Sequence, residues 1–523
     1  MLRPSSLALL VLAATAANPS NANAYPAYCA KDMSANKIQP LEPSTARTLQ
    51  LVQVQVVVRH GARTPWSGKK CWDGYDEEWN CSIRELQRPE IVGNKTWAAS
   101  REFEKIYTRG DNTFRGTCNL GQMIDEGYSQ QVSNGQHLRE AYVGPQGLFK
   151  STEGLDFTNT SDFYFESSDI PRTINSGMVQ FTKAPDIVDF IIMDTLFTST
   201  NASSSSIASP SKSPPVPWHT NDYARNTITP NPSMCPKLNW IDAHWRQSPE
   251  YVRWTRSAAN TKLEQDIRRV VTNYDHVTLY DCFMTAKCTD RALPAGIDDD
   301  LFVRSTSREE SVQIQQYLYN HSAYAQAGMA AYTKRLRDRA VAVTLGHGPR
   351  FVLSAAHDTT IMPLLAALGG SAWLTEWVPY ASHMIFEVYA NATSHYVRVL
   401  YQGQPLAIPG CATEVCPFEA LLALTAFSID ESICDEPSTA GQQKQQQPIA
   451  TLPGTYDLDW GMYMGAQLKL ALLYIAPESV SSSGWTYAYV VGGVLAGTAL
   501  GYFAGARSAD RQGYTALGDK SLS

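Results

Sequence analysis

Residues 56–65 read VVVRHGARTP, a strand signal that runs directly into a polar loop. Apolar and polar side chains alternate from Leu49 to Val56, and the fully apolar run from Val56 to Val58 is typical of a strand buried on both faces. Open α/β sheets place their ligand crevices at the carboxyl ends of such strands. The stretch therefore predicts an α/β fold with a binding loop at residues 59–65.

The loop presents one imidazole, His60, between two guanidiniums, Arg59 and Arg63. Guanidinium groups match phosphate or carboxylate oxygens bidentately and stay charged at any usable pH. A neutral imidazole can attack phosphorus without bringing a second negative charge to an anion. The alternative is a structural turn whose arginines pair with carboxylates, and a bare R-H-G string does not separate the two interpretations.

A second chemical stretch, FYFESSDIPRTINS, occupies residues 163–176. An aromatic strand again runs into a polar turn, and Pro171 suits the first turn of a helix that would carry Arg172 at its positive end. Anions bind readily at such helix starts. Taken alone, Arg172 is more simply an exposed surface charge.

The third chemical stretch, FVLSAAHDTT at residues 351–360, precedes an apolar helix predicted over 361–368. An isolated His-Asp pair such as His357-Asp358 would usually be a structural hydrogen-bonded pair. The alternative is a catalytic pair, in which the carboxyl of Asp358 donates a proton to a poor leaving group; a positioned proton donor contributes typically about 10²–10⁴ in rate.

These three motifs together resemble the histidine acid phosphatases: R-H-G-x-R-x-P after an apolar strand, an S-x-D-x-x-R-T-like segment, and H-D. The resemblance implies a phosphoglycerate mutase-like core sheet flanked by helices, with a smaller, mainly helical cap domain from the middle third. It implies two-step hydrolysis of phosphate monoesters without a cofactor, with His60 as nucleophile and Asp358 as proton donor. The substrate phosphate would be bound by Arg59, Arg63, Arg172 and His357.

Further landmarks of the family are found at residues 379–382, 409–411 and 416–417, so that the resemblance covers roughly residues 49–434. We place the phosphatase domain at residues 48–436. Apolar periodicity predicts helices over 123–142, 258–274 and 309–342. Gly127 and Gly135 weaken the first of these helix signals.

Composition is that of a globular protein: 523 residues, 44% hydrophobic and 18% charged. The formal charge of −7 gives no reason to expect nucleic acid as a partner. An anionic substrate would have to be bound by a local cluster of arginines, whose attraction must overcome the repulsion from the net negative charge of the protein.

The N-terminus reads as a secretory signal peptide over residues 1–24. Arg3 precedes an apolar run from Leu7 to Ala14, and Ala22-Asn23-Ala24 offers a cleavage site, with residues 14–16 as a second candidate. Ten cysteines and six N-x-[ST] sequons fit a luminal or extracellular protein. The sequons, which predict glycosylation, are Asn80, Asn94, Asn159, Asn201, Asn320 and Asn391.

Three cysteine pairs are close in sequence and compatible with local disulfides: Cys71 with Cys81, Cys282 with Cys288, and Cys411 with Cys416. The partners of the other four cysteines cannot be deduced from spacing. Zinc is the alternative use of cysteine, but no C-x-x-C pair occurs and no histidine pair has finger spacing. We therefore expect no metal.

Beyond the phosphatase domain, residues 437–484 read as a polar linker and juxtamembrane stalk. The 22 residues 485–506, from Trp485 to Ala506, carry no charge and have the length of a bilayer span, with Arg507 just beyond. With a cleaved signal peptide, this predicts a type I membrane protein with its enzyme in the lumen and residues 507–523 in the cytosol.

Gly493, Gly497, Gly501 and Gly505 form a small-residue stripe along this span. Homodimerisation through the stripe and simple glycine-rich packing are the two alternatives. In the tail, Tyr514 followed three residues later by Leu517 looks like a tyrosine-based endosomal and lysosomal sorting signal, and we expect the protein in a lysosomal, endosomal or cell-surface membrane.

Two other functions remain in view. The landmarks around Cys411 and Cys416 also resemble lysophosphatidic acid phosphatases, so a specific lipid or sugar phosphate is an alternative substrate. The non-enzyme alternative is a surface glycoprotein that retains the phosphatase scaffold without its activity. That alternative predicts loss of at least one phosphate-binding residue, and none is missing.

Overall fold

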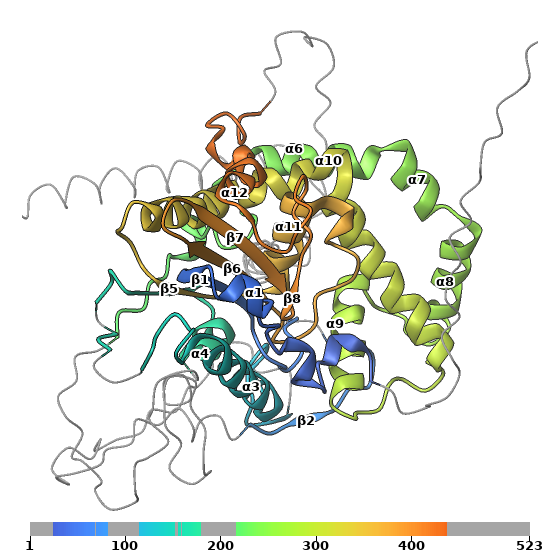
Figure 1. The fold of residues 1–523 in the computed structure, drawn as a ribbon. Coiled ribbons are helices and arrows are strands. Elements are labelled where there is room, and N and C mark those ends of the chain that lie inside the picture. Colours follow the sequence, from blue (N-terminus) through green and yellow to red (C-terminus); the bar gives the residue numbers. More distant parts are fainter. Residues whose placement is uncertain are drawn as a thin grey trace, which may run out of the picture. The chain divides into compact units, whose positions relative to one another are not determined.

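The strand predicted before the R-H-G loop is β1 (Gln50–Arg59), and it lies inside the main sheet of the molecule (Figure 1). It pairs in parallel with β5 (Phe351–Ala356) on one side and antiparallel with β6 (His383–Ala390) on the other. The neighbouring strands on both edges form hydrogen bonds with its backbone N–H and C=O groups, and apolar layers cover both of its faces. This explains the continuous apolar run that marks it in the sequence.

The main sheet is mixed, with the strand order β4-β5-β1-β6-β7-β8 and with β9 paired to β7. Strands β4, β5 and β1 run parallel, whereas β6, β7, β8 and β9 join by antiparallel pairing. The α/β prediction is therefore confirmed. The other strands are β2 (Glu78–Trp79), β3 (Arg115–Gly116), β4 (Phe163–Ser167), β7 (His395–Tyr401), β8 (Gln404–Pro405) and β9 (Cys416–Pro417).

Helices cover both faces of this sheet. Successive side chains of β1 point to opposite faces, so neighbouring residues of this strand pack in different apolar clusters. Val57 belongs to an apolar cluster with α10 (Asp299–Thr344) and α11 (Asp358–Gly369). Val56 and Val58 belong to another cluster, which includes side chains of α3 (Asp125–Tyr142). Figure 1 shows α3 on one side of the sheet and α10 and α11 on the other.

The described residues from Lys237 to Thr344 are mainly helical, and they contribute to an apolar cluster apart from the sheet. That cluster joins α8, α9 and the start of α10 to residues near the N-terminus and near Cys71. The helices of the described chain not yet given bounds are α1 (Pro43–Ala46), α4 (Pro171–Met178), α6 (Lys237–Gln247), α7 (Pro249–Thr255), α8 (Ala258–Arg268), α9 (His276–Cys288) and α12 (Phe418–Leu424). Short 3-10 turns are η1 (Ala27–Cys29), η2 (Met33–Asn36), η4 (Tyr223–Arg225), η5 (Gly370–Ala372) and η6 (Ala426–Ile429).

Two predicted helices differ from those observed. The helix expected over 258–274 ends at Arg268, because the chain turns there and α9 begins after its own cap, Asp275, whose carboxylate accepts a hydrogen bond from the Thr278 N–H. The helix expected over 309–342 is the later part of the longer α10. The backbone of α10 leaves the helical region between Tyr319 and Ser322, where Asn320 has a φ of 48°.

The disulfides correct two of the three local pairs suggested by spacing. Cys282 and Cys288 lie on the same helix, α9, where six residues rise by about 9 Å, beyond the reach of one disulfide. Cys411 does pair with Cys416, as predicted. The other bonds are Cys29–Cys288, Cys71–Cys282, Cys81–Cys118 and Cys235–Cys434, so all ten cysteines are paired.

The structure, a computed structural model, describes residues 25–67, 70–81, 115–151, 155–157, 159–178 and 216–436. All of these belong to one compact unit. The predicted signal peptide, linker, span 485–506 and tail lie outside the described residues. Among the residues that the structure describes, no helix is long and apolar enough to cross a membrane.

Four of the six predicted glycosylation sites fall within the described chain, and the side chains of Asn80, Asn159, Asn320 and Asn391 are all exposed. Asn320 lies in the interruption of α10. Asn94 and Asn201 lie outside the described residues.

Candidate active site

The three chemical stretches meet at one edge of the sheet. Strands β4, β5 and β1 are parallel neighbours, so their carboxyl ends lie together. His60 directly follows β1, His357 directly follows β5, and Arg172 is the second residue of α4, just beyond β4. The ring centroids of His60 and His357 are 5.6 Å apart, with the rings edge to face. Residues separated by hundreds of positions therefore share one site.

His60 is buried and oriented by its own loop. Its Nδ1 lies 2.9 Å from the carbonyl oxygen of Gly61, which can only accept a hydrogen bond. Nδ1 therefore carries the hydrogen, and Nε2 keeps a free lone pair. Burial lowers the pKa of His60 well below its usual value, and the charges of Arg172, Arg59 and Arg63 act in the same direction. Both effects favour the neutral form of the imidazole.

Helix α3 positions the loop through a contact that only glycine permits. A Cβ atom on Gly61 would lie 2.2 Å from the carbonyl oxygen of Gly127, and a Cβ on Gly127 would lie 2.2 Å from that of Ala62. The Ala62 N–H also donates a hydrogen bond of 2.8 Å to Gln130 Oε1. The glycine that weakened the helix signal is therefore required for the loop to lie against α3.

Arg59 is fully buried and fixed by three hydrogen bonds. Its Nη1 donates to the carbonyl oxygen of Val378 at 2.6 Å. Its Nη2 donates to the Tyr28 hydroxyl at 2.8 Å and to Asp358 Oδ2 at 2.7 Å. Its Nε finds no hydrogen-bond partner within the described chain. This orphaned donor is available to an anion in the site.

Arg63 forms a buried ion pair with Asp281 of α9, at 2.8 Å between Nη1 and Oδ1. The other oxygen of Asp281 accepts a hydrogen bond from the Trp66 backbone N–H. Burial raises the pKa of Asp281 even against the attraction of the guanidinium. Among the described atoms, Arg63 Nε also lacks a partner. Sequence analysis missed Asp281, because nothing local marks a mid-helix carboxylate 218 residues away.

His357 is oriented by a short chain of hydroxyl groups. Its Nε2 lies 2.7 Å from Ser168 Oγ, which lies 2.8 Å from Thr173 Oγ1. The Thr173 hydroxyl donates to the carbonyl oxygen of Ile170. Ser168 therefore donates to Thr173 and accepts from the Nε2–H of His357, so a phosphate oxygen would have to replace Ser168 as the acceptor of this N–H. Ser168 was quoted within the second stretch but not recognised as the residue that orients the second histidine.

Asp358 lies between Arg59 and Trp377, whose indole Nε1 donates to Asp358 Oδ2 at 3.0 Å. Burial would raise the pKa of Asp358, but the charges of Arg59 and Arg63 and the indole hydrogen bond together outweigh it and lower that pKa to about 2. The carboxyl is thus ionised unless another anion takes over Arg59.

The site as a whole is built for an anion. Three guanidiniums and two carboxylates leave one positive charge in excess around the neutral His60. In the part of the chain that the structure describes, no group of three histidine, cysteine, aspartate or glutamate side chains could hold a metal ion. The excess positive charge and the unpartnered Nε donors of Arg59 and Arg63 favour the binding of an anion.

Several known proteins are similar in sequence to this chain. Counting factor 60 from Dictyostelium discoideum is 28% identical over 390 residues, which cover 73% of this chain and 86% of that protein. Lysosomal acid phosphatase from Bos taurus is 24% identical over 354 residues, covering 64% and 76%. Lysophosphatidic acid phosphatase type 6 from Homo sapiens is 22% identical over 415 residues, covering 74% and 86%.

Residues 50–402, more than half of the chain, match the family described as "Histidine phosphatase superfamily (branch 2)". The match begins with β1 and ends just after β7, so it includes all three chemical stretches. On these grounds the chain belongs to branch 2 of the histidine phosphatase superfamily.

Proposed function

We propose that this protein is an acid phosphatase that hydrolyses phosphate monoesters through a phosphohistidine intermediate. The observation that carries the proposal is His60, a buried neutral imidazole whose Nε2 is free and whose surroundings hold Arg59, Arg63 and Arg172. Family membership and the similarity to a lysosomal acid phosphatase support it.

In the first step, the substrate phosphate is bound by what we term the phosphate cluster: Arg59, Arg63, Arg172 and His357. The unpartnered Nε donors of Arg59 and Arg63 supply hydrogen bonds that strengthen as charge develops on the non-bridging oxygens. His60 Nε2 attacks phosphorus, a P–N bond forms, and the P–O bond to the alcohol breaks. Asp358 protonates the departing oxygen.

Asp358 can act as this acid only if the substrate raises its pKa. With its pKa near 2, the carboxyl is ionised while Arg59 is its partner. A bound phosphate dianion competes for the same guanidinium and adds negative charge beside the carboxyl, and both effects favour the protonated form. The substrate thereby prepares its own proton donor.

In the second step, the Asp358 carboxylate accepts a proton from water as that water attacks the phosphohistidine. The P–N bond breaks, inorganic phosphate leaves, and His60 returns to its neutral form. Because burial and nearby arginines hold the His60 pKa low, the nucleophile stays unprotonated in acid. The chemistry is therefore suited to an acidic compartment.

We propose the same layout for the whole chain as its sequence predicts: a signal peptide over 1–24, the phosphatase domain in the lumen, and a single span from Trp485 to Ala506. Five disulfides and four exposed sequons within the described chain support an oxidising, glycosylating compartment. The destination would be a lysosomal, endosomal or cell-surface membrane.

A narrower substrate is a second candidate. The similarity to lysophosphatidic acid phosphatase type 6 over 74% of this chain favours a lipid phosphate monoester. Comparing kcat/KM for lysophosphatidic acid, sugar phosphates and an aryl phosphate would separate a broad phosphatase from a specific one.

The test uses the full-length chain made in a secretory host and solubilised in detergent. We expect it to hydrolyse a chromogenic phosphate ester with its maximum below neutral pH, and we expect His60→Ala to abolish turnover. An inactive, correctly disulfide-bonded parent would favour the non-enzyme alternative. Turnover retained in His60→Ala would exclude the phosphohistidine step.

A further inference from the structure

The N-terminal segment, residues 25–36, precedes the part of the chain that matches the family, yet it contacts the catalytic centre. Tyr28, in η1, accepts a hydrogen bond of 2.8 Å from Arg59 Nη2 through its hydroxyl. The guanidinium carbon of Arg59 also lies 4.6 Å from the Tyr28 ring centroid and 4.5 Å from that of Tyr380. The segment thus supplies both a hydrogen bond and an aromatic surface to a phosphate-binding residue.

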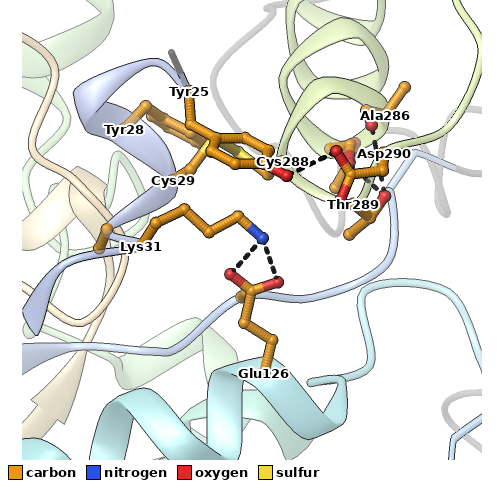
Figure 2. Close-up of a disulfide and its surroundings, with 12 residues drawn as sticks. Tyr25, Tyr28, Cys29, Lys31, Glu126, Ala286, Cys288, Thr289 and Asp290 are labelled. Atoms are coloured by element: carbon orange, nitrogen blue, oxygen red, sulfur yellow. Dashed lines mark hydrogen bonds and ion pairs between the residues drawn. A yellow bond between two sulfur atoms is a disulfide. The ribbon is translucent and has the colours of Figure 1, made fainter. Parts of the chain in front are cut away.

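Tyr28 is itself firmly held. Its side chain is buried, and its carbonyl oxygen accepts a hydrogen bond of 2.9 Å from the Tyr380 N–H. The next residue, Cys29, forms a disulfide with Cys288 at the end of α9, and Figure 2 shows the surroundings of this bond. The Cys29 carbonyl oxygen accepts a hydrogen bond of 2.8 Å from Gln130 Nε2. Covalent and polar contacts therefore fix this tyrosine from two sides.

Two exposed contacts accompany the disulfide in Figure 2. Lys31 pairs with Glu126 of α3 at 2.8 Å, and the Tyr25 hydroxyl donates to Asp290 Oδ1 at 2.6 Å. Exposed pairs of this kind contribute little to stability. The disulfide and the buried contacts of Tyr28 therefore determine where the segment lies.

The far end of the segment reaches the nucleophile loop as well. Asn36 is buried, and its Nδ2 donates to the carbonyl oxygen of Ala381 at 2.8 Å. The Ala381 N–H in turn donates to the carbonyl oxygen of His60 at 3.1 Å. The segment is thus linked to the backbone of His60 as well as to the side chain of Arg59.

From these contacts we propose that Tyr28 is a positioning residue for Arg59, and that the Cys29–Cys288 disulfide completes the active site by holding Tyr28 in place. The inference rests on the proposed phosphatase function. Arg59 Nη2 is shared between the Tyr28 hydroxyl and Asp358, while the Val378 carbonyl oxygen accepts from Nη1, and this arrangement leaves Nε as the donor without a partner among the described residues. Without Tyr28, the guanidinium loses one acceptor and one ring and can turn toward Asp358.

The experiment compares single substitutions in the full-length protein. Tyr28→Phe keeps the ring and loses the hydroxyl, so kcat/KM should fall several-fold. Tyr28→Leu loses both, and kcat/KM should fall about tenfold or more, because small displacements of binding groups are costly in catalysis. Tyr25→Phe is the matched control: it removes a tyrosine hydroxyl from the same segment, whose partner Asp290 lies away from the site, and should leave the kinetics unchanged.

The disulfide is tested with the double substitution Cys29→Ser/Cys288→Ser. We expect a raised KM and a raised inhibition constant for inorganic phosphate, each about tenfold, with the thermal unfolding transition retained. The control Cys411→Ser/Cys416→Ser removes a disulfide of 5-residue separation near the C-terminal end of the domain and should change neither constant.

A merely structural role predicts a different result. Partial misfolding reduces the number of active sites, but it leaves KM and the phosphate inhibition constant of the remaining sites at parental values. Parental values for both constants in the Tyr28→Leu and Cys29→Ser/Cys288→Ser proteins would overturn the inference. If the cysteine variant does not fold, the inference is tested by the kinetic constants of the two Tyr28 variants, which keep the disulfide. An inactive parent would instead refute the proposed function, so the two failures are distinguishable.

Discussion

The substitution Asp358→Asn removes the proposed proton donor while keeping the size and polarity of the side chain. An asparagine at this position can still accept hydrogen bonds from Arg59 and Trp377 through its amide oxygen. The variant should therefore fold and bind phosphate. What it loses is the ability to protonate the leaving group, so its defect should depend on how much the alcohol needs that proton.

Arg59 and its neighbours lower the pKa of Asp358 to about 2, and this pKa sets how far the substrate must shift the carboxyl before it can act as an acid. At a pH of about 5, a carboxyl with that pKa is protonated roughly once in 10³ chains, a deficit of about 4 kcal/mol at 1.36 kcal/mol per pKa unit. Bound phosphate offsets most of this deficit by taking over Arg59. For alkyl phosphates, whose leaving groups need the proton, we expect Asp358→Asn to lower kcat/KM by about 10²–10⁴.

The assay measures kcat/KM for a series of aryl and alkyl phosphates whose leaving groups span a wide range of pKa values. In the parent, the logarithm of kcat/KM should depend weakly on leaving-group pKa, and in Asp358→Asn it should fall steeply. Asp281→Asn serves as the comparison, because it removes the other carboxylate of the site but leaves the proton donor in place. In Asp281→Asn, kcat/KM should fall by a similar factor for all leaving groups.

The reasoning is refuted if Asp358→Asn slows every ester by the same factor. That outcome would mean that Asp358 acts through Arg59 or through the shape of the site. If Asp358→Asn were as active as the parent on alkyl phosphates, Asp358 would be neither the proton donor nor a residue that acts through Arg59 or the shape of the site.

Three further predictions follow from the site. Asp281→Asn leaves the buried guanidinium of Arg63 without its charge partner and should lower the free energy of unfolding by about 3–5 kcal/mol in urea denaturation, and a loss below about 1 kcal/mol would contradict the assigned pairing. Gly61→Ala would place a Cβ 2.2 Å from the Gly127 carbonyl oxygen, displace the nucleophile, and reduce kcat/KM by about 10² or more, so parental kinetics would disprove that contact. Because the folded-state pKa of His60 lies below 6.5, the unfolded chain takes up a proton first, and the stability that this residue contributes is lost as pH falls below 6.5. Over the same range kcat/KM should show no decline attributable to imidazole protonation, and a decline centred near pH 6.5 that titrates with His60 by NMR would contradict the pKa assignment.

Sequence analysis predicted the parts of the site that local patterns encode. Strand β1, helix α3 and the start of α4 carry clear periodicity or turn signals, and each lies where its pattern placed it. The parallel order of β4, β5 and β1 then brings His60, His357 and the start of α4 together. Fold class and the place of each motif at a strand end were predictable because each depends on residues close together in the chain, whereas the convergence of the motifs depends on the strand order and was expected from the family resemblance.

The residues that tune the site were not predictable in the same way. Asp281 and Tyr28 contact Arg63 and Arg59 across 218 and 31 positions, and neither belongs to a recognisable motif. Their roles arise from tertiary contacts through α9 and η1. The sequence likewise gave no sign that Asp358 is held ionised by Arg59, because a pKa depends on burial and neighbours and not on local pattern.

Disulfide pairing shows the same limit. Proximity in sequence suggested Cys282 with Cys288, but a helix separates these two residues and directs each to a different partner. Those partners, Cys71 and Cys29, tie α9 to the loop after the nucleophile and to the N-terminal segment. The pairing therefore depends on the assembled fold.

The central claim is that phosphate is transferred to His60, and rapid-quench labelling tests it most directly. The parent protein is mixed with a phosphate ester labelled in its phosphoryl group, quenched in base to preserve phosphohistidine, digested and analysed by mass spectrometry. We predict up to one label per chain, on the imidazole of His60, and none in His60→Ala. A label on any other residue, or single-turnover hydrolysis that leaves His60 unlabelled throughout, would contradict the proposed mechanism.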